Sequence, residues 1–231
     1  MTEAVIRPGS TAHSHGAAEI PLQTRSERLR SSNPADHVAI DGRDEQWRYL
    51  DAARLAGLDV NALSDAAADL AFTGPNEFTF ELVDASDPLF GTAGLPEDLP
   101  SANGWSAAAK AAKVTLNGEA PEAAIIKVDG IKRDRAAHII VSSKVHSRGT
   151  VVIDHTGDAS LAEIVEIIVG DESELTVVSI QDWDSEAVHT SAQFARIGRN
   201  AKLKHIVISL GGKTVRVTPT AEFTAPGAEV E

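Results

Sequence analysis

Ahead of Gly170 the chain reads Leu161-Ala162-Glu163-Ile164-Val165-Glu166-Ile167-Ile168-Val169, and Gly157 stands shortly before this segment. Its apolar residues fit one face of a helix, because they recur at spacings of three and four residues. Five of its nine residues are β-branched, however, and a glycine lies on either side. Stiff β-branched side chains suit a pleated strand better than a helix. We therefore predict a strand over 161–169.

The polar turn that precedes this segment recurs along the chain. Loosely matching turns begin at Gly157, Gly170, Gly198 and Gly227, which are 13, 28 and 29 residues apart. The first three are each followed by a β-branched run. A chain that turns a corner at each glycine lays its strands over one another, and such rungs bury their apolar sides only by stacking. The repeat favours a right-handed parallel β-helix and leaves a β-sandwich with glycine turns open.

The charge pattern supports stacking. Ten acidic residues and no Lys or Arg lie between Asp154 and Glu186, whereas six basic residues and no Asp or Glu lie between His189 and Val217. Opposite charges on neighbouring strands attract by about 0.2–1 kcal/mol per pair. Adjacent acidic and basic layers would therefore fix the stacking order. We expect replacement of Lys202 and Lys204 by Glu to lower the thermal stability.

The composition changes along the chain. Residues 1–136 contain 12 Val plus Ile and residues 137–231 contain 23. This enrichment predicts a mainly β second part, with a boundary between about 105 and 137. We expect a disordered lead at 1–24, a helical N-terminal region at 25–115 and a β-helix core at 116–231.

Local patterns divide the N-terminal region further. The break at Gly74 and Pro75 separates a helix-like part from a strand-like part. The predicted segments are a short helix at 25–30, a helical face at 51–58, an amphipathic helix at 61–70 with Asn61 as N-cap, a strand at 78–83, a loop at 84–104 and a helix at 106–113.

The end of the chain falls just after the turn at Gly227. Glu231 stops within what reads as a fresh rung. An uncapped solenoid exposes apolar core and unpaired strand edges. We therefore expect residues 1–231 to be a fragment of a longer protein.

The overall composition excludes several classes of function. The 231 residues include 34 acidic and 21 basic residues, for a net charge of −13, and no cysteine. The missing cysteines exclude a disulfide scaffold, thiolate ligation of zinc or an Fe–S cluster by this chain alone, and a thiol nucleophile. The acidic balance argues against a general nucleic-acid or anionic-membrane binder. Without a secretory signal or an apolar run of about 18 residues, we expect a cytoplasmic protein.

The remaining chemical patterns are weak. His13 and His15 in the lead could bind a metal adventitiously, but a solvated tail is favoured. His189 and His205 could converge across stacked rungs, but structural or surface histidines are favoured. The pair Asp182 and Asp184 shares one side of a strand, which is compatible with a β-helical carbohydrate-active enzyme. Acidic residues at a solvated turn are the more common case.

Two further patterns concern phosphate. The basic stretch 196–216 leaves a nucleic-acid binder open, although aromatic residues do not alternate with its basic ones. Gly211-Gly212-Lys213-Thr214 ends like a phosphate loop, but Val207 stands where that motif needs glycine, so we predict a tight hairpin turn. We assign no catalytic, cofactor-binding or metal-ligating residue.

Two stretches resemble the SufB/SufD family, and SufD of the actinobacterial type most closely. The first runs from Gly42 to Tyr49 and is moderately specific. The second, 177–205, is the most specific and includes Gln181-Asp182-Trp183 and His189-Thr190-Ser191-Ala192-Gln193-Phe194. The resemblance covers about 25–231.

The resemblance implies a function that composition does not. SufD is a non-catalytic scaffold of the SUF machinery for iron–sulfur cluster assembly, with a helical N-terminal region, a right-handed parallel β-helix and a helical C-terminal region. Its β-helix pairs with that of SufB, and its C-terminal region binds the SufC ATPase. Because this chain ends before that region, the resemblance implies an incomplete SufB contact, no SufC contact and no cluster ligand.

Overall fold

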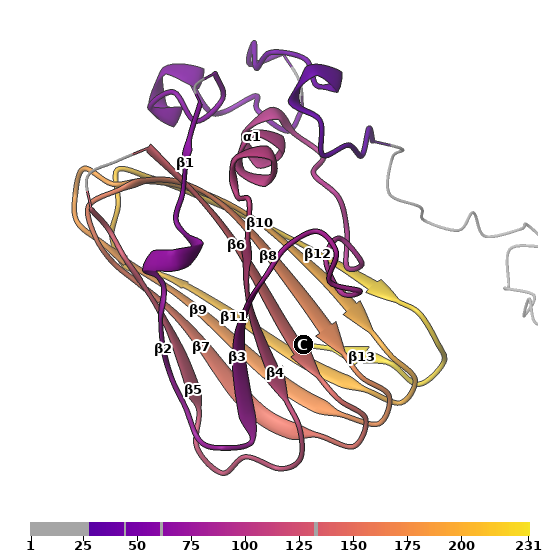
Figure 1. The fold of residues 1–231 in the computed structure, drawn as a ribbon. Coiled ribbons are helices and arrows are strands. Elements are labelled where there is room, and N and C mark those ends of the chain that lie inside the picture. The colour runs from indigo at the N-terminus through magenta and orange to yellow at the C-terminus, as the bar shows by residue number, and fades with distance from the viewer. Residues whose placement is uncertain (1–27, 44, 61, 132–133) are drawn as a thin grey trace, which may run out of the picture.

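The protein is described here by a computed structural model that covers residues 28–43, 45–60, 62–131 and 134–231. Two stacks of parallel strands form a β-solenoid of about four turns (Figure 1). Its helices are η1 (Pro34–Asp36), η2 (Ala52–Leu55), η3 (Ala67–Asp69) and α1 (Leu99–Ala107). Its strands are β1 (Ser64–Asp65), β2 (Ala71–Thr73), β3 (Phe78–Val83), β4 (Ala111–Leu116), β5 (Ala124–Asp129), β6 (Asp134–Ser143), β7 (Arg148–Gly157), β8 (Ser160–Val169), β9 (Glu174–Trp183), β10 (Val188–Ile197), β11 (Lys202–Ser209), β12 (Thr214–Phe223) and β13 (Glu229–Val230).

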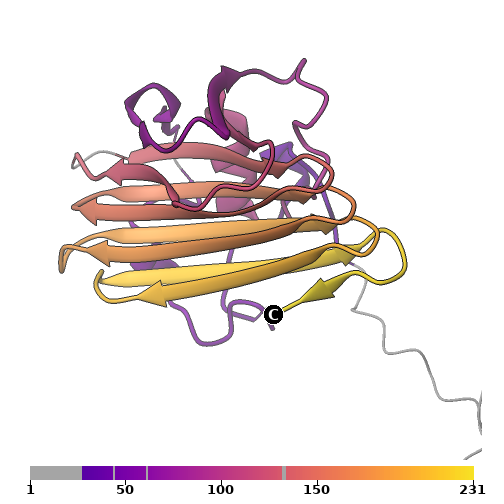
Figure 2. The same cartoon turned by 90° about the horizontal axis from the view of Figure 1, so that it is seen from below.

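Consecutive strands of the solenoid alternate between two sheets. The first sheet has the order β12-β10-β8-β6-β4-β3, with β1 beside β6, and the second has the order β13-β11-β9-β7-β5-β2. Asp134 lies opposite Ser160, and Ser160 lies opposite Val188, so one turn takes 26 or 28 residues at these positions. Figure 2 shows the turns stacked in sequence order. The parallel pairing confirms the β-helix prediction and shows that the β-sandwich alternative is wrong.

The glycine repeat marks the corners of the coil. Gly170 and Gly198 follow β8 and β10, which are neighbours in one sheet, whereas Gly157 is the last residue of β7 and leads into the opposite corner. This explains why the first spacing was about half of the others. A Cβ at Gly170 would lie 2.6 Å from the carbonyl oxygen of Ser143 in the preceding turn. The close approach of successive turns therefore requires glycine there.

The interior of the solenoid is a continuous aliphatic core. The pleat sends alternate residues of each strand inward. On β8 these include Leu161, Val165 and Ile167, all of which belong to this core. The other side of β8 is buried as well, because the N-terminal region packs there: Ala162 contacts a cluster around Leu58. Figure 1 shows α1 over this sheet. Burial of both faces of β8 explains why residues 161–169 are apolar almost throughout, and why their spacing did not distinguish a helix from a strand.

The segments at 78–83 and 161–169 are strands, as predicted. The amphipathic helix predicted over 61–70 is wrong, since the described part of this segment forms β1 and η3. Ser64 and Asp65 pair with β6, and Leu70 is buried against the solenoid core. The apolar residues of this segment therefore pack on the solenoid instead of on one helical face.

The helix predicted over 106–113 also differs from the structure. The α-helix is Leu99–Ala107, which begins inside the predicted loop and ends at the second residue of the predicted helix, and β4 begins at Ala111. The Asp98 side chain accepts a hydrogen bond from the Ser101 amide at the helix start, and Pro100 occupies the first turn. Proline is tolerated there, so it marked a helix start and not a loop. Residues 1–27 and Asn61 lie outside the described residues, and the division at 115/116 stays a proposal.

The charge layers are confirmed only in part. Arg199 pairs with Asp171 and Lys213 with Glu186, which joins the basic segment to the acidic one. Lys202 and Lys204 instead pair with Glu229 and Glu231, in the turn that follows. No helix among the described residues is long and apolar enough to cross a membrane.

Candidate functional site

A group of polar side chains interrupts the aliphatic interior. His155 of β7, Glu163 of β8 and His189 of β10 each occupy an inward position of their strand. Glu163 stands between Leu161 and Val165, which both belong to the core. All three polar side chains are 0% exposed. The fold therefore brings together three ionisable groups in a place where an unpaired charge would be costly.

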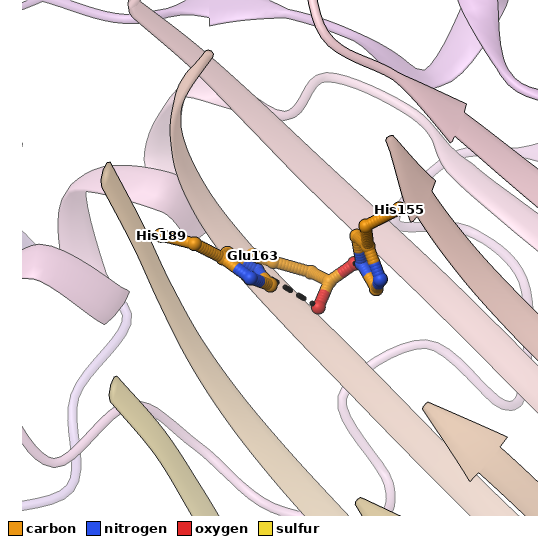
Figure 3. Close-up of side chains that lie close together, drawn as sticks. All are labelled: His155, Glu163 and His189. Carbon is orange, nitrogen blue, oxygen red and sulfur yellow. Dashed lines mark hydrogen bonds and ion pairs between the residues drawn. The ribbon is translucent and has the colours of Figure 1, made fainter. Parts of the chain in front are cut away.

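The carboxylate of Glu163 lies between the two imidazoles (Figure 3). His155 Nε2 is 2.8 Å from Glu163 Oε1. His189 Nε2 is 3.3 Å from Oε2, at ion-pair distance but without hydrogen-bond geometry. The two histidines thus lie next to different oxygens of the same carboxylate. We call these three residues the interior cluster.

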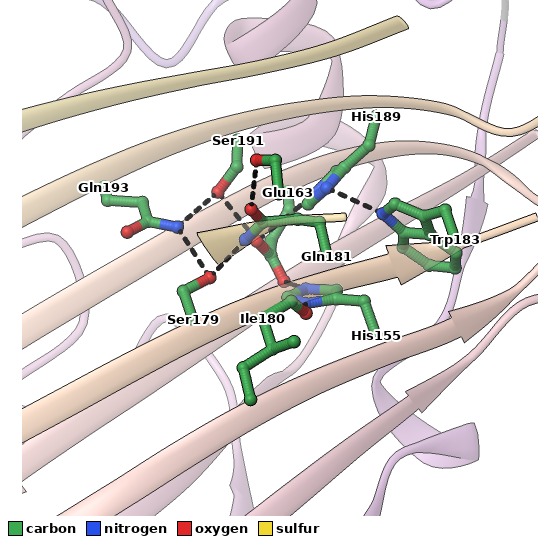
Figure 4. Close-up of polar contacts among 10 residues, drawn as sticks. His155, Glu163, Ser179, Ile180, Gln181, Trp183, His189, Ser191 and Gln193 are labelled. Atoms are coloured by element: carbon green, nitrogen blue, oxygen red, sulfur yellow. Dashed lines mark hydrogen bonds and ion pairs between the residues drawn. The ribbon is translucent and has the colours of Figure 1, made fainter. Parts of the chain in front are cut away.

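Neighbouring side chains complete the polar contacts (Figure 4). The Ser191 hydroxyl donates to Glu163 Oε2 at 2.7 Å. The Trp183 indole N–H donates to His189 Nδ1 at 3.1 Å. A second set of hydrogen bonds lies alongside and joins Ser179, Gln181, Ser191, Gln193 and Ser209. The polar interior therefore spans β7 to β11, whereas the inward residues of β4 and β5 are aliphatic.

The hydrogen-bond partners of His155 define its charge. Its Nδ1 lies 2.7 Å from the carbonyl oxygen of Ile180, which only accepts hydrogen bonds. Its Nε2 faces the carboxylate of Glu163, so the pair holds one proton between them. Burial alone would lower the pKa of His155, but the charge and hydrogen bond of Glu163 raise it. We assign an imidazolium to His155 and a carboxylate to Glu163.

The pKa of Glu163 agrees with this assignment. Burial alone would raise that pKa, but His155, and to a lesser extent His189, hold it well below its ordinary value. His189 behaves in the opposite way, because burial lowers its pKa and Glu163 offsets only part of the effect. The interior cluster therefore contains a cation, an anion and a neutral imidazole.

The interior cluster also has the side-chain types of a metal site. One ligand atom from each residue lies within 4.8 Å of the others, and two imidazoles with a carboxylate are ligands for zinc or non-haem iron. In the arrangement described here a proton occupies His155 Nε2, and His189 uses its Nδ1 to accept from Trp183. A metal ion would have to displace the first and rearrange the second. The geometry is that of a hydrogen-bonded ion pair.

A second buried carboxylate lies on the other side of β8. Glu166 accepts hydrogen bonds from the backbone amides of Gly91 and Ala93, at 2.7 and 2.9 Å, and faces His138 Nε2 at 2.8 Å. The ring of His138 packs against Trp105 and against Phe90 of the same N-terminal segment. These contacts attach the segment 89–105 to the outside of the solenoid.

Comparison with known proteins connects this architecture to a family. Residues 127–231 match the family model of the SufBD core domain, described as SUF system FeS cluster assembly. They contain β6 to β13 and the interior cluster. The β-solenoid belongs to the SufB/SufD family.

Relatives of this SufBD core occur in mycobacteria. An iron–sulfur cluster assembly SufBD family protein of Mycobacterium leprae is 34% identical over 210 residues, which are 88% of this chain and 54% of that protein. One of Mycobacterium tuberculosis is 34% identical over 230 residues, 97% of this chain and 57% of that protein. The chain thus spans about half the length of these curated relatives. No solved structure matches it.

The histidines singled out in the sequence do not meet in the SufBD core. His205 lies on β11 opposite Val177, and no hydrogen-bond partner is found for its Nε2. Burial lowers its pKa. His189 instead meets His155, which the sequence did not single out. His13 and His15 lie outside the described residues.

The carboxylates considered for sugar chemistry face away from the interior. Asp182 and Asp184 are exposed, and Trp183 between them points inward. Asp184 lies in the turn after β9, where its amide donates to the Gly157 carbonyl oxygen. Asp182 lies at the exposed end of β9, and Asp184 lies in the solvated turn that the sequence favoured.

Five of the six basic residues in the stretch 196–216 of the SufBD core are paired with acids. Arg199, Lys202, Lys204, Lys213 and Arg216 each form an ion pair with a carboxylate. The Gly211-Gly212 segment joins β11 to β12, which lie in different sheets. The predicted hairpin is therefore wrong. The segment turns a corner of the coil, and a Cβ at Gly211 would clash with the Trp183 carbonyl oxygen.

A signal for both buried carboxylates was present in the sequence. Glu163 and Glu166 are the charged residues of the apolar segment 161–169. Once such a segment is known to be buried on both faces, each carboxylate in it needs a partner. The partners His155 and His138 could not be named, since pairing between turns depends on the register of strands in three dimensions.

Proposed function

We propose that this chain is part of a SufD-like scaffold subunit for iron–sulfur cluster assembly, acting in the cytoplasm as part of a SufBCD complex. The observation that supports this most is the match of residues 127–231 to a SufBD core on a parallel β-solenoid. The subunit would hold its partners in place and make no bonds itself. Full burial of the interior cluster supports this role, because a buried cluster cannot touch a substrate without a conformational change.

We infer that the partners are SufB, through the β-solenoid, and SufC, through a C-terminal region that this chain does not contain. The strands β12 and β13 each have one neighbour and offer unpaired backbone groups. Large apolar side chains are exposed on this last turn, namely Ile208, Leu210, Phe223 and Val230. An uncapped turn of a solenoid exposes such edges and apolar side chains to whatever stacks next, so we assign the SufB contact to the β-solenoid as a whole and not to this turn.

Copurification tests these assignments. Tagged residues 1–231 and a longer natural chain are each expressed with SufB and with SufC. We expect the longer chain to retain both and residues 1–231 to retain no SufC. Retention of SufC by residues 1–231 would contradict the placement of that contact, and loss of SufB from the longer chain would contradict the proposed function.

Two other functions have direct assays. A β-helical carbohydrate-active enzyme would release reducing ends from a polysaccharide, and loss of that turnover in Asp182→Asn would implicate the carboxylate. A nucleic-acid binder would shift DNA in a gel at low salt. We expect neither signal, because Asp182 and Asp184 lie at the end of β9 and in the turn after it, and five of the six basic residues are paired with acids.

A further inference from the structure

The contact between Trp183 and His189 determines where the proton of His189 lies. An indole N–H only donates hydrogen bonds, so His189 Nδ1, at 3.1 Å, is the acceptor. An imidazole that accepts at Nδ1 and is neutral carries its proton on Nε2. That nitrogen faces the carboxylate of Glu163 at 3.3 Å. The neutral form of His189 thus accepts the hydrogen bond of the indole and directs its own Nε2 proton toward the negative charge of Glu163.

Protonation of His189 removes the acceptor. The new proton would occupy Nδ1, and two N–H groups would then face each other. Trp183 is 4% exposed, so no bulk water is in place to accept its hydrogen bond. A buried donor without an acceptor is unfavourable, and so is the approach of two donors. The indole therefore has to move when His189 becomes charged.

The surroundings of His189 do not compensate a second positive charge. Glu163 is already paired with the imidazolium of His155 and accepts from Ser191. Asp154, which precedes His155 in the chain, raises the pKa of His155 through its charge. The register neighbours of His189 are Leu161 on β8 and Val215 on β12, and neither carries a charge. Charging His189 would change the interior cluster from neutral to a net charge of +1.

Trp183 connects the interior cluster to the edge of the solenoid. On its other side the indole lines a small void together with Ala66, Leu70 and the charged residues Asp69, Asp129 and Arg135. Arg135 pairs with Asp69 of η3. The N-terminal segment around η3 therefore packs beside the end of the interior that Trp183 occupies. A displaced indole would disturb this packing.

We propose that His189 is a proton-sensitive contact: its neutral imidazole holds the Trp183 indole inside the solenoid, and protonation of Nδ1 releases it. The release loosens the packing of residues 66–70 on the solenoid edge. It needs no change at the His155–Glu163 pair, which keeps its single proton. This inference is independent of the proposed function, since it uses only contacts within the chain.

Nuclear magnetic resonance of the 231-residue chain tests the proposal. The indole N–H resonance of Trp183 is assigned with Trp183→Phe and followed from pH 8 downward, while circular dichroism confirms that the chain stays folded. We expect one titration step below the ordinary histidine pKa of about 6.5, with at least tenfold faster hydrogen exchange of the indole proton. An indole resonance that stays constant until the chain unfolds would overturn the proposal.

Two variants show which histidine is responsible. His189→Gln keeps a carbonyl that can accept from Trp183 but does not titrate, so we expect the step to disappear. His205→Gln is the matched control, because His205 is also an inward histidine whose pKa is lowered by burial. We expect the Trp183 indole resonance of His205→Gln to show the same titration step as that of the unchanged chain. A step that persists in His189→Gln would overturn the proposal.

Direct observation of the ring covers the case in which His189→Gln does not fold. The nitrogen-15 shifts of His189 in the unchanged chain distinguish an accepting Nδ1 from a protonated one. We expect an accepting Nδ1 and a protonated Nε2 at pH 8. A protonated Nδ1 at that pH, or stoichiometric Co²⁺ binding that depends on His155 and His189, would overturn the proton assignment.

Discussion

Glu163 and Glu166 lie on the same strand and point to opposite faces of the sheet, yet both carboxylates are fully buried and each faces a histidine of another strand. Glu163 pairs with His155 in the interior, and Glu166 pairs with His138 beneath the N-terminal segment. One strand thus carries two buried acids with different tasks. The first connects the two sheets across the interior, and the second holds a segment against the outer face.

Removing the interior acid should be more harmful than removing the pair. Glu163→Gln leaves the imidazolium of His155 buried without its counter-charge, and breaking a buried pair in this way costs about 3–5 kcal/mol. We expect this loss in the free energy of unfolding, measured with urea. The double variant Glu163→Gln, His155→Gln should recover part of it. Additive losses would show that the two side chains do not act as a pair.

Removing the outer acid should release the N-terminal segment locally. Glu166→Ala leaves the amides of Gly91 and Ala93 without their acceptor. We expect faster hydrogen exchange and proteolysis within residues 89–105, with the solenoid strands still protected. Exposed Glu122→Ala serves as the control and should leave the pattern unchanged. Uniform loss of protection across the chain would contradict a local role.

The stability of the chain should be greatest near neutral pH. The pKa of His189 is lowered, so the unfolded chain takes up a proton there first, and stability falls as the pH drops below about 6.5. The pKa of Glu163 is lowered from 4.5, so its contribution is complete above that value and is lost as the pH falls through its folded pKa. The pKa of His155 is raised, so its contribution is lost as the pH rises from about 6.5 through its folded pKa.

Urea unfolding at pH 5, 7 and 9 checks this profile. His189→Gln should reduce the loss of unfolding free energy between pH 7 and pH 5, because it removes the histidine that takes up a proton in the unfolded chain. His146→Gln, at an exposed turn histidine, is the control. An unchanged slope in His189→Gln would show that other groups set the acid limit.

A stacked arginine attaches another part of the N-terminal region. The guanidinium of Arg216 lies 3.9 Å from the ring centre of Trp47 and 2.9 Å from Asp98 Oδ2. Lysine retains the charge but not the planar stacking. We expect Arg216→Lys to lower the free energy of unfolding by about 1 kcal/mol. Arg148→Lys, at an exposed ion pair, should change it by less. Equal values would show that the stacking contributes nothing.

The structure revises the expectation for the charge layers. Lys202 and Lys204 are 56% and 51% exposed and pair with exposed glutamates. Exposed pairs contribute at most about 1 kcal/mol each. We now expect the substitution of both by Glu to lower the melting temperature by about 8 °C or less, since the two pairs together contribute at most about 2 kcal/mol. A loss above about 10 °C in a thermal scan would show that the layers matter more than their exposure suggests.

Much of the solenoid was predictable from local pattern. Corner glycines 28 and 29 residues apart and β-branched runs favour a stack of strands, since each turn can bury its apolar side only against the next. The helices were less predictable. The apolar residues of 63–70 carry a helical spacing, but the solenoid edge buries them better than a helix of their own would, and Pro100 reads as a loop until Asp98 is seen to cap the helix.

The sequence by itself favoured stacked strands without excluding a β-sandwich, and it determined that the core is aliphatic and that two glutamates lie within a segment too apolar to be solvated. Only the tertiary structure decided which residues neutralise them. His155 and Glu163 come from opposite sheets, and His189 and Trp183 come from two further strands. Their contacts depend on the register between successive turns. That register is set when the strands pair in the folded coil, so it cannot be read from spacings along the chain.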